Sequence, residues 1–378
     1  MKVLIVITKS DIGGAQVFVH KLAKNLIKKG CVVEIAAGEG GYLFGELDKD
    51  GITYHKLNSL KRTVNVFSFL YFIYDLFRFL NKNRYDVIHL NSSNTLIGAA
   101  AIAYLKDKPK SVFTFHGLSF LDEKYEINSL YKFITKLSFR IMLKFIDSPV
   151  FVSRNNFTIA QNENIVTGGD VILNGLDKEE LNYLDAPTAR KFFSEKCGID
   201  LSGSFLIGST GRLAYQKNYE FLINNFSRIK EGIPGVKLAI IGDGPNYDLY
   251  KSMIAGKGLE KDLILLGAIE NSYKYIKAFD LFTLSSRYEG LSISIIEALY
   301  AGLPVLASDI GGNREVMNND ERQLYKFDDI EDYVEKLSFL SRNREAVSAY
   351  NMEIKELFSL DKMVDSYKNL YDKLVNGK

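Results

Sequence analysis

The chain has 378 residues, with 48 basic and 46 acidic side chains, two cysteines, no tryptophan and 47% hydrophobic residues. This composition is that of a globular protein with about two domains, and it excludes disordered, collagen-like and disulfide-rich classes. The net charge of +2 gives no general signal for nucleic-acid binding, and none is expected. However, residues 1–150 have 21 basic and 13 acidic side chains, and the remaining residues have a net charge of −6. The first half alone, at +8, is therefore expected to meet an anionic partner.

Apolar runs of strand length alternate with helical patterns along the whole chain. Strands are predicted at residues 3–7, 32–37, 52–57, 87–90, 112–115, 149–152, 205–209, 236–241, 263–266, 281–284 and 304–307. Helices are predicted at residues 15–29, 95–105, 129–146, 219–230, 247–255 and 292–300, with several more after residue 328. This alternation predicts an α/β protein with parallel sheets covered by helices on both faces.

The pattern of strand, glycine-containing loop and helix near the N-terminus has a loose counterpart at residues 204–218. Between them, residues 175–200 are charged and contain no predicted strand, which is typical of a linker. We therefore expect two Rossmann-like domains with a central cleft. Ligands of such sheets bind beyond the carboxyl ends of the strands, so the strand-end loops should contain the reactive groups.

Compartment signals are weak. Cys31 and Cys197 form no disulfide or metal-binding pattern. The apolar run at residues 3–7 is too short for a signal peptide, and no run reaches about 18 apolar residues. A cytoplasmic location is expected.

Residues 128–146 contain no acid and place Lys132, Lys136, Arg140 and Lys144 at four-residue spacing, opposite apolar positions. On a helix, such a basic stripe can bind an anionic membrane surface, with about 1 kcal/mol from each cation near the headgroups. The protein would then be peripheral on the inner face of the cell membrane. The alternative is a surface helix with solvated cations and its apolar face in the core.

The loops after the predicted strands of the first half contain two candidate groups. Gly13-Gly14 precedes a helix, whose N-terminal N–H groups can bind an anion, although a tight turn explains the pair equally well. His116 follows one strand, and His89 and Asn91 at the end of the preceding strand could stand beside it. A structural role is the alternative for a lone histidine.

In the second half, Gly211-Arg212 and then Lys217 follow the first strand. A planar guanidinium and an ammonium five residues apart can neutralise a diphosphate without a metal ion, whereas the alternative is a solvated charge pair. Gly242 ends the next strand in a turn whose glycines permit close packing.

The most informative motif is Glu289-Gly290-Leu291-Ser292, followed by Glu297. Ser292 is a good N-cap residue, which places Glu297 in the second helical turn and leaves Glu289 on the loop. The two carboxylates can then contact different parts of one elongated ligand, such as the sugar and the ribose hydroxyls of a sugar nucleotide. Capping or solvation of both carboxylates is the alternative.

Taken together, these motifs resemble those of the family-4 retaining glycosyltransferases, which have the GT-B fold. Asn174-Gly175 and the run Gly311-Gly312-Asn313-Arg314-Glu315 fit the same family, and the resemblance spans nearly the whole chain. Where this sequence has Asn91, the family often has a second histidine. The resemblance implies an acceptor-binding domain at residues 1–175, a nucleotide-sugar-binding domain at 176–360 and a helix at 361–378 that crosses back to the first domain.

Roles carried over from the family follow the motifs. Arg212 and Lys217 would hold the diphosphate, and Glu297 the ribose. Glu289 would contact the donor sugar and His116 a sugar hydroxyl. The implied donor-binding positions are Gly14, Gly211, Gly242, Gly290, Leu291, Ser292 and Glu297. The acceptor-side candidates are Asn91 and Asn174.

The expected activity is transfer of a sugar, from a UDP-sugar first of all, to a glycan or a polyprenyl-diphosphate-linked acceptor with retention of configuration. A hexosyl- or N-acetylhexosaminyltransferase of surface-polysaccharide or lipopolysaccharide assembly is expected. The alternatives are a nucleotide-sugar epimerase of the same fold and a non-catalytic binding module. No cofactor or metal is expected, because the D-x-D pattern Asp48-Lys49-Asp50 ends a predicted helix instead of a strand.

Overall fold

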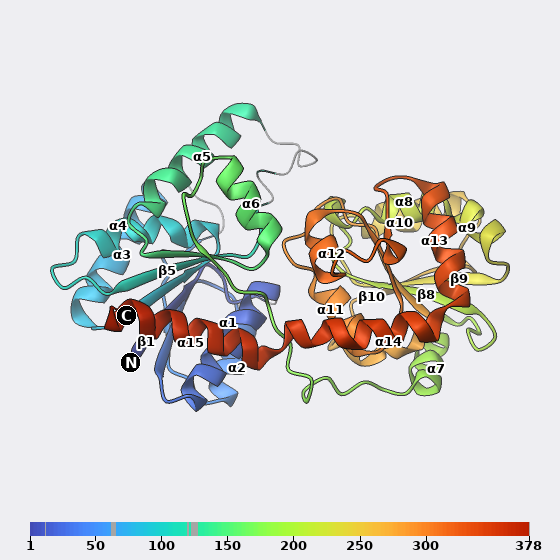
Figure 1. The fold of residues 1–378 in the computed structure, drawn as a ribbon, viewed down its shortest axis with the longest axis horizontal. Helices are drawn as coiled ribbons and strands as arrows, with labels where there is room; N and C mark the ends of the chain where they lie inside the picture. The colour runs from blue at the N-terminus through green and yellow to red at the C-terminus, as the bar shows by residue number, and fades with distance from the viewer. Residues whose placement is uncertain (12, 62–65, 119–120, 122–127, 378) are drawn as a thin grey trace. The chain divides into compact units, whose positions relative to one another are not determined.

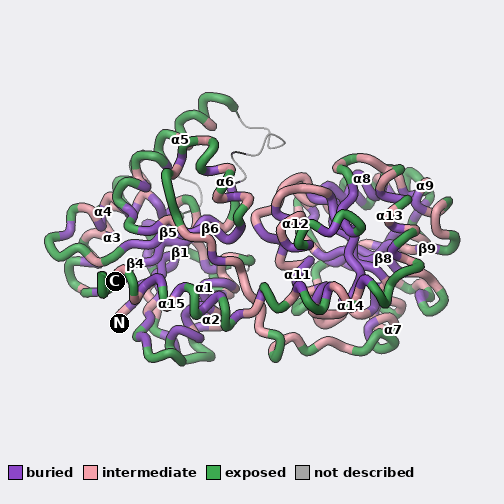
Figure 2. The backbone as a smooth tube through the Cα atoms, in the orientation of Figure 1, coloured by how far each residue is buried: buried purple, intermediate pink, exposed green. Residues whose placement is uncertain are grey.

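The computed structural model describes residues 1–377 except residue 12 and residues 62–65, 119–120 and 122–127 (Figure 1). The chain forms two compact units. Unit 1 comprises Met1–Asn174 and Asp361–Lys378, and unit 2 comprises Gly175–Leu360. Each unit has its own parallel sheet with helices around it, and the strands are the most deeply buried segments (Figure 2). The α/β class with two Rossmann-like domains is thus confirmed.

Unit 1 is an alternation of strands and helices completed by the last helix of the chain. Its elements are β1 (Lys2–Ile7), α1 (Gly14–Lys28), β2 (Val32–Ala37), α2 (Tyr42–Lys49), β3 (Tyr54–Lys56), α3 (Val66–Lys82), β4 (Val87–Asn91), η1 (Ser93–Gly98), α4 (Ala99–Ala103), β5 (Lys110–Phe115), α5 (Ser129–Leu143), β6 (Ser148–Phe151), α6 (Arg154–Asn162), β7 (Asp170–Val171) and α15 (Leu360–Asn376).

The sheet of unit 1 has the order β3-β2-β1-β4-β5-β6-β7, with every pair parallel. Val3 to Ile7 of β1 are completely buried, as expected for a strand covered on both faces. The central strands β4 and β5 are neighbours in register, with Asn91 opposite Thr114. The carboxyl ends of β1, β4 and β5 therefore lie at one edge of the sheet.

The C-terminal helix α15 packs onto this sheet through two buried tyrosines. The Tyr371 hydroxyl lies 2.7 Å from Nδ1 of His89, and the Tyr367 hydroxyl lies 3.0 Å from Oγ1 of Thr114. Buried hydroxyl and imidazole groups need hydrogen-bond partners, and these two contacts provide them. Helix α15 therefore belongs to unit 1, with Tyr367 and Tyr371 in the core of that unit.

Unit 2 repeats the alternation with more short helices. Its elements are α7 (Ala186–Cys197), β8 (Phe205–Thr210), η3 (Tyr215–Lys217), α8 (Tyr219–Asn224), α9 (Phe226–Gly232), β9 (Val236–Ile241), α10 (Tyr247–Gly256), β10 (Leu263–Gly267), η4 (Ser272–Ala278), β11 (Leu281–Leu284), α11 (Ile293–Tyr300), β12 (Val305–Ser308), α12 (Gly311–Val316), η5 (Glu321–Gln323), β13 (Leu324–Tyr325), α13 (Ile330–Arg342), α14 (Arg344–Ile354) and η6 (Lys355–Phe358).

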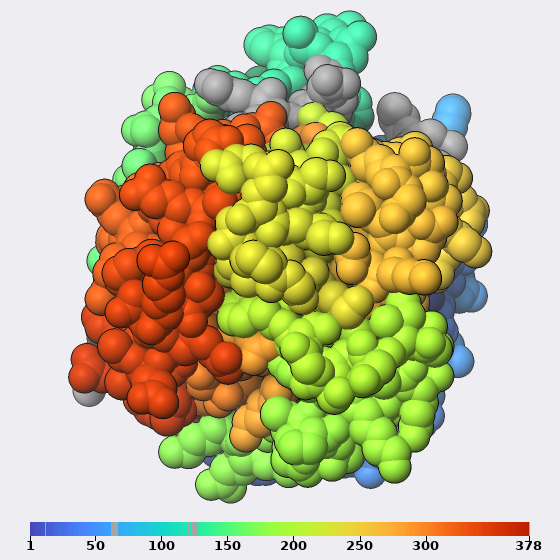
Figure 3. Space-filling model, turned by 90° about the vertical axis from the view of Figure 1, so that its right-hand side faces the viewer, coloured from blue at the N-terminus to red at the C-terminus, as the bar shows by residue number. Residues whose placement is uncertain are grey.

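The sheet of unit 2 has the order β10-β9-β8-β11-β12-β13, again with parallel pairs. Its first strand in sequence, β8, is central, so the loop after β8 lies beside the loops after β9 and β11. Helix α13 packs against α9 on the face shown in Figure 3. An exposed ion pair joins Arg228 of α9 to Glu331 of α13.

The structure contains helices α3, α6, η4 and α12, for which no helix is predicted, and it differs from the predicted elements in other places as well. The two-residue strands β7 and β13 have no hydrophobic run long enough to identify them. The helix predicted at residues 219–230 is interrupted at Asn225, which separates α8 from α9. In the helix predicted at residues 95–105, the first part is the 3-10 helix η1. Finally, the expected linker at 175–200 includes α7, which begins at the N-cap Asp185 and buries Phe193.

Candidate functional site

The predicted site residues of unit 2 gather at the carboxyl edge of its sheet, on the loops after β8, β9 and β11. Lys217 Nζ lies 2.6 Å from Oε1 of Glu289, although the two residues are far apart in sequence. Their side chains are only 13% and 9% exposed. The ammonium and the carboxylate thus neutralise each other in a shielded position.

Two further side chains hold the Glu289 carboxylate. Ser286 Oγ donates to Oε1 at 2.7 Å, and Gln216 Nε2 donates to Oε2 at 3.2 Å and to the Tyr288 carbonyl at 3.0 Å. The carboxylate is therefore fixed by charge-assisted hydrogen bonds, which are stronger than neutral ones. Ser286 and Gln216 were not predicted from the sequence. Only their adjacency to the predicted site loops distinguishes them from other polar residues.

Two predicted glycines bring the loops after β8 and β9 into backbone contact. A Cβ on Gly242 would lie 1.9 Å from the carbonyl oxygen of Gly211, and Gly242 has a φ of +152°. A Cβ on Gly211 would lie 2.9 Å from Cε of Lys217. The protein itself therefore requires glycine at 242, and Gly211 lies directly against the stem of Lys217.

Helix α11 presents the second carboxylate. Ser292 occupies the N-cap position, as predicted, but its hydroxyl lies 3.2 Å from Oγ of Ser294 and makes no capping hydrogen bond. Leu291 and Ser292 are buried, and Gly290 packs its carbonyl against Gly312, whose Cβ would lie 2.7 Å from that oxygen. These contacts fix the first turn of the helix.

Glu297 is in the second turn of α11. Burial raises the pKa of its carboxyl group to about 7, and the nearby Lys217 charge opposes this shift. Among the residues that the structure describes, no side chain forms a hydrogen bond or ion pair with this carboxylate. A shielded carboxylate with its acceptor positions unused is suited to bind hydroxyl groups of a ligand.

The remaining cation and two buried polar atoms surround the same edge. Arg212 is exposed, and its guanidinium has no ion-pair partner within the described ranges. Thr210 Oγ1 and Asn313 Oδ1 are buried without a hydrogen-bond partner in those ranges. Buried polar atoms are nearly always paired, so these two are additional candidates for contact with a ligand. Thr210 was not identified from the sequence.

In unit 1, the predicted residues His116 and Asn91 meet at the carboxyl ends of β5 and β4. His116 Nε2 lies 3.0 Å from Oδ1 of Asn91, whose Nδ2 faces the His89 carbonyl at 3.4 Å. The Phe18 ring packs edge-on against the imidazole, with 4.8 Å between centroids. Burial lowers the pKa of His116 to about 4, so the imidazole is neutral at pH 7.

His89 does not join this pair. It is completely buried, and its two ring nitrogens lie 2.7 Å from Thr114 Oγ1 and 2.7 Å from the Tyr371 hydroxyl. Burial, and to a smaller extent His116, lowers the pKa of His89 to about 3. His89 is thus a core side chain held by strand β5 and helix α15. Its role is structural, which is the alternative stated above for a lone histidine.

Two other predicted positions in unit 1 remain open to a ligand. A Cβ on Gly14, the first residue of α1, would meet no protein atom within 4 Å, so no close contact inside the protein requires glycine there. Oδ1 of Asn174 is buried without a hydrogen-bond partner in the described part of the chain.

The D-x-D residues are located as the sequence predicts, at the end of α2. Asp50 follows the helix and lies 2.7 Å from Nε2 of His20 and 2.9 Å from Nζ of Lys24. Over the described residues, no three histidine, cysteine, aspartate or glutamate side chains form a group that could hold a metal ion.

The basic stripe of α5 is oriented differently from the prediction. Lys132 Nζ donates to the Leu121 carbonyl at 3.3 Å, Lys136 forms an ion pair with Glu163, and Arg140 donates to the Glu163 carbonyl at 2.7 Å. Three of the four cations are therefore tied to the protein, and apolar side chains occupy the outer face. The periodicity identifies two faces of the helix but not which one meets the core.

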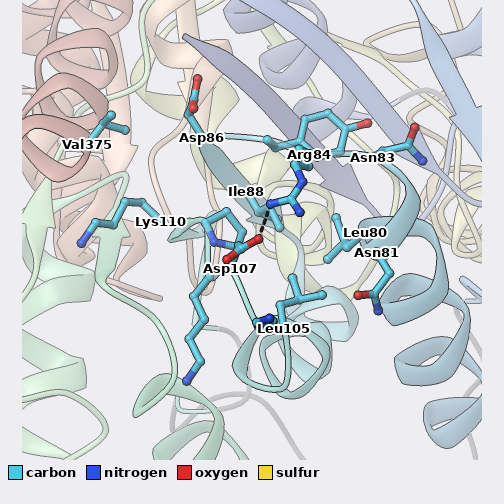
Figure 4. Close-up of a pocket in the computed structure, with 14 residues that line it drawn as sticks. Leu80, Asn81, Asn83, Arg84, Asp86, Ile88, Leu105, Asp107, Lys110 and Val375 are labelled. Carbon is cyan, nitrogen blue, oxygen red and sulfur yellow. Dashed lines mark hydrogen bonds and ion pairs between the residues drawn. The ribbon is translucent and has the colours of Figure 1, made fainter.

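A pocket of about 570 Å³ lies at the opposite edge of the unit 1 sheet (Figure 4). Residues before β4 and β5 line it, including Arg84 and Asp107, which form an exposed ion pair. Because reactive loops of parallel sheets follow the carboxyl ends of strands, this amino-end pocket is separate from the site.

Two family models together match most of the chain. The model of "Glycosyltransferase Family 4" matches residues 12–180, and that of "Glycosyl transferases group 1" matches residues 195–356. The chain is 29% identical over 359 residues to the UDP-Gal:alpha-D-GlcNAc-diphosphoundecaprenol alpha-1,3-galactosyltransferase of Escherichia coli, covering 92% of this chain and 90% of that protein. It is 26% identical to the O-antigen biosynthesis glycosyltransferase WbnH of Escherichia coli, covering 88% and 91%.

Among solved structures, Anabaena HepE in complex with UDP and glucose superposes with a TM-score of 0.82 at 18% identity, covering 99% of this chain and 100% of that one. Two parallel-sheet units with this topology form the GT-B fold of glycosyltransferases. Within that class, the chain belongs to the family-4, group 1 glycosyltransferases.

Proposed function

We propose that this glycosyltransferase moves a hexosyl or N-acetylhexosaminyl group from a UDP-sugar to a lipid-linked saccharide, with retention of configuration and without a metal ion. The observation on which the proposal rests is the shielded Lys217–Glu289 pair beside Gly211-Arg212 and Glu297. It combines cations for a diphosphate with carboxylates for sugar and ribose hydroxyls at one sheet edge.

The two cations act on the leaving group. As the bond between the anomeric carbon and the diphosphate breaks, negative charge grows on the bridging oxygen. Arg212 offers a planar guanidinium with several donors, and Lys217 a point charge already oriented by Glu289. Donors fixed before the reaction stabilise this charge without reorganisation. A resident divalent cation would duplicate their role, and the proposal therefore assigns none.

The acceptor hydroxyl forms the new bond to the anomeric carbon on the face that the diphosphate leaves. Its proton passes to the departing diphosphate, so the products are the glycosylated acceptor and a nucleoside diphosphate. Glu289, held by Ser286 and Gln216, contacts the donor sugar in this scheme. This reaction scheme needs no nucleophile from the protein.

Glu297 binds the ribose hydroxyls, which donate to its ionised form. Because burial raises its pKa to about 7, part of the empty enzyme is protonated at neutral pH. Donor binding favours the carboxylate and releases that proton, so donor affinity is expected to increase with pH up to and slightly above 7.

In unit 1, Asn91 serves as a positioning residue for His116. Since its Nδ2 faces the His89 carbonyl, its Oδ1 accepts the Nε2–H of His116. This contact favours the tautomer with a bare Nδ1, which accepts a hydrogen bond from a sugar hydroxyl. Asn174, with its unpaired Oδ1, is proposed to bind the acceptor.

A lipid-linked acceptor is supported by a relative. The Escherichia coli galactosyltransferase with which this chain is 29% identical is named for a GlcNAc-diphosphoundecaprenol acceptor. Similarity over 92% of the chain supports an acceptor of the same class, a saccharide on a polyprenyl diphosphate, in surface-polysaccharide assembly.

The decisive experiment incubates the enzyme with a panel of nucleotide sugars, with and without a polyprenyl-diphosphate-linked saccharide and with and without chelator. We expect release of UDP, and an acceptor product whose anomeric configuration, determined by NMR, matches that of the donor. Inverted product would disprove retention, and loss of activity with chelator would disprove the metal-free mechanism. A new sugar nucleotide formed without acceptor would identify an epimerase instead.

A further inference from the structure

Helix α5 exposes an apolar face along its whole length. Phe139 and Leu143 point into the core of unit 1, whereas the outer residues are between 43% and 65% exposed. These residues, the α5 face, are Leu130, Tyr131, Phe133, Ile134, Leu137, Ile141 and, just beyond the helix, Phe145. A continuous apolar surface of this kind on a folded protein usually marks a binding surface.

A second helix of unit 1 has the same property. Phe67, Leu70, Tyr71 and Tyr74 of α3 are exposed, with Phe67 at 82%. Both α3 and α5 pack against η1, and their inner residues share one hydrophobic core, so they belong to one layer of helices on the same side of the sheet (Figure 1). The outward surfaces of this layer are thus apolar on two helices.

Cations flank the α5 face, and the acidic side chains beside them already accept hydrogen bonds within the protein. A groove of about 730 Å³ between α5, the loop before β7 and α15 contains Arg140, Lys144 and Lys373. The groove also contains two acids. Asp147 accepts hydrogen bonds from the Ser111 amide and hydroxyl, and Asp170 accepts one from the Ser148 hydroxyl. Lys144 and Lys373 are exposed.

We propose that this layer binds an anionic lipid bilayer, with the α5 face inserted among the upper acyl chains and the groove cations at the level of the phosphates. Aromatic and branched aliphatic side chains on one face, with lysine and arginine beside them and no acid in residues 128–146, are the composition of a helix that lies in the interface. A protein partner would leave the flanking cations unmatched unless it were acidic, whereas lipid phosphates complement them directly.

The biological role of this membrane-binding surface rests on the proposed function, in which the acceptor is a lipid-linked saccharide. The α5 helix follows β5 and runs back toward the start of β6, where Ser111 contacts the Phe145 carbonyl. Its first turn therefore lies at the edge of the sheet that contains His116. An acceptor anchored in the bilayer by a polyprenyl chain would be presented along this helix to the acceptor-side residues.

The absence of tryptophan from the chain permits a direct test. Phe133→Trp places a single indole on the α5 face, and Leu249→Trp places one on α10 of unit 2, where Leu249 is 51% exposed. With phosphatidylcholine–phosphatidylglycerol vesicles, we expect a blue shift of Phe133→Trp emission and quenching by brominated lipid, and neither for Leu249→Trp. An unshifted Phe133→Trp spectrum would overturn the proposal.

Binding is then measured by vesicle flotation. Ile134→Glu/Leu137→Glu should reduce partitioning at least about tenfold, because two apolar side chains are replaced by charges, while Leu249→Glu should bind like the unmodified protein. Lys144→Gln/Lys373→Gln should abolish the preference for phosphatidylglycerol and keep the weaker binding to phosphatidylcholine. Equal binding of all variants would overturn the proposal. It would also be overturned if the protein bound no vesicles and instead formed a dimer that Ile134→Glu/Leu137→Glu disrupts.

Donor hydrolysis in buffer separates this proposal from the proposed function. Ile134→Glu/Leu137→Glu should hydrolyse UDP-sugar at the unmodified rate, because its changes are remote from Lys217 and Glu289 in sequence and belong to unit 1. If no donor is hydrolysed by any variant but Phe133→Trp still inserts, the donor chemistry fails and the membrane surface stands.

Discussion

In both halves of this glycosyltransferase, the net charge differs from the charge at the carboxyl edge of the sheet. Residues 1–150 have a net charge of +8, yet the carboxyl edge of the unit 1 sheet holds a neutral imidazole, an amide and a phenyl ring. The remaining residues have a net charge of −6, and the corresponding edge of unit 2 holds the Lys217–Glu289 ion pair together with Arg212 and Glu297. The net charge of a half therefore does not predict the chemistry at its sheet edge, which depends on a few side chains.

The largest expected effect tests the charged half. Lys217→Ala and Arg212→Ala should each reduce turnover by about 10²–10³, because the leaving diphosphate loses a fixed donor. Lys251→Ala, an exposed lysine of α10, is the matched control and should keep full turnover. Steady-state rates with a saturating donor measure this effect. Near-normal turnover of both variants would mean that the cations at the unit 2 edge are not needed for the reaction.

The next effect concerns the backbone contact that shapes the charged edge. Gly242→Ala should lower the free energy of unfolding by about 2 kcal/mol or more, because its φ is +152° and the new Cβ would overlap the Gly211 carbonyl. Gly256→Ala at the end of α10 is the control, since it meets no atom and should stabilise the helix slightly. Urea denaturation distinguishes the two, and equal stabilities would show that these loops do not depend on close packing.

The Glu297 carboxyl group should give a smaller, pH-dependent effect. Its pKa is raised from 4.5 to about 7 in the folded protein, so burial of the charge destabilises the fold progressively as the pH rises from about 4.5 to 7, and fully above 7. Glu297→Gln should therefore gain roughly 1–3 kcal/mol of stability at pH 8 and little at pH 4.5.

The same substitution should weaken donor binding at pH 8. Calorimetric titration with UDP-sugar measures this loss, and for the unmodified enzyme it should show proton release near pH 7. A variant that is neither more stable at pH 8 nor weaker in donor affinity would exclude Glu297 as the ribose ligand.

The smallest effect tests the neutral half. Asn91→Leu should lower kcat/KM about tenfold, because His116 loses the hydrogen bond that selects its tautomer. Asn91→Asp should instead raise the pKa of His116 and shift the acidic limb of the pH–rate profile to higher pH. An unaltered profile in Asn91→Asp would mean that Asn91 does not act through His116. Asn81→Leu on α3 is the control.

Much of the fold could be predicted because each central strand is a separate apolar run. The edge strands β7 and β13 could not, since two residues have no periodicity. His116 and Asn91 could be expected to meet, because consecutive strands in such sheets are usually neighbours. The Lys217–Glu289 bond joins residues 72 positions apart and is a tertiary contact without a local signal. Likewise, the pattern of α5 contains apolar residues on both faces, so only the packing of Phe139 and Leu143 shows which face is inward.

If Lys217 binds a diphosphate as proposed, its contact with Glu289 also affects which anions bind there. Because Lys217 already has a counter-ion held by Ser286 and Gln216, an incoming anion enters by exchange instead of simple addition. A lone phosphate or sulfate must compete with that resident carboxylate for one ammonium group. A sugar nucleotide also brings ribose hydroxyls for Glu297, sugar hydroxyls for Glu289 and a second phosphate for Arg212. We therefore expect phosphate and sulfate to compete only weakly with a sugar nucleotide for this site.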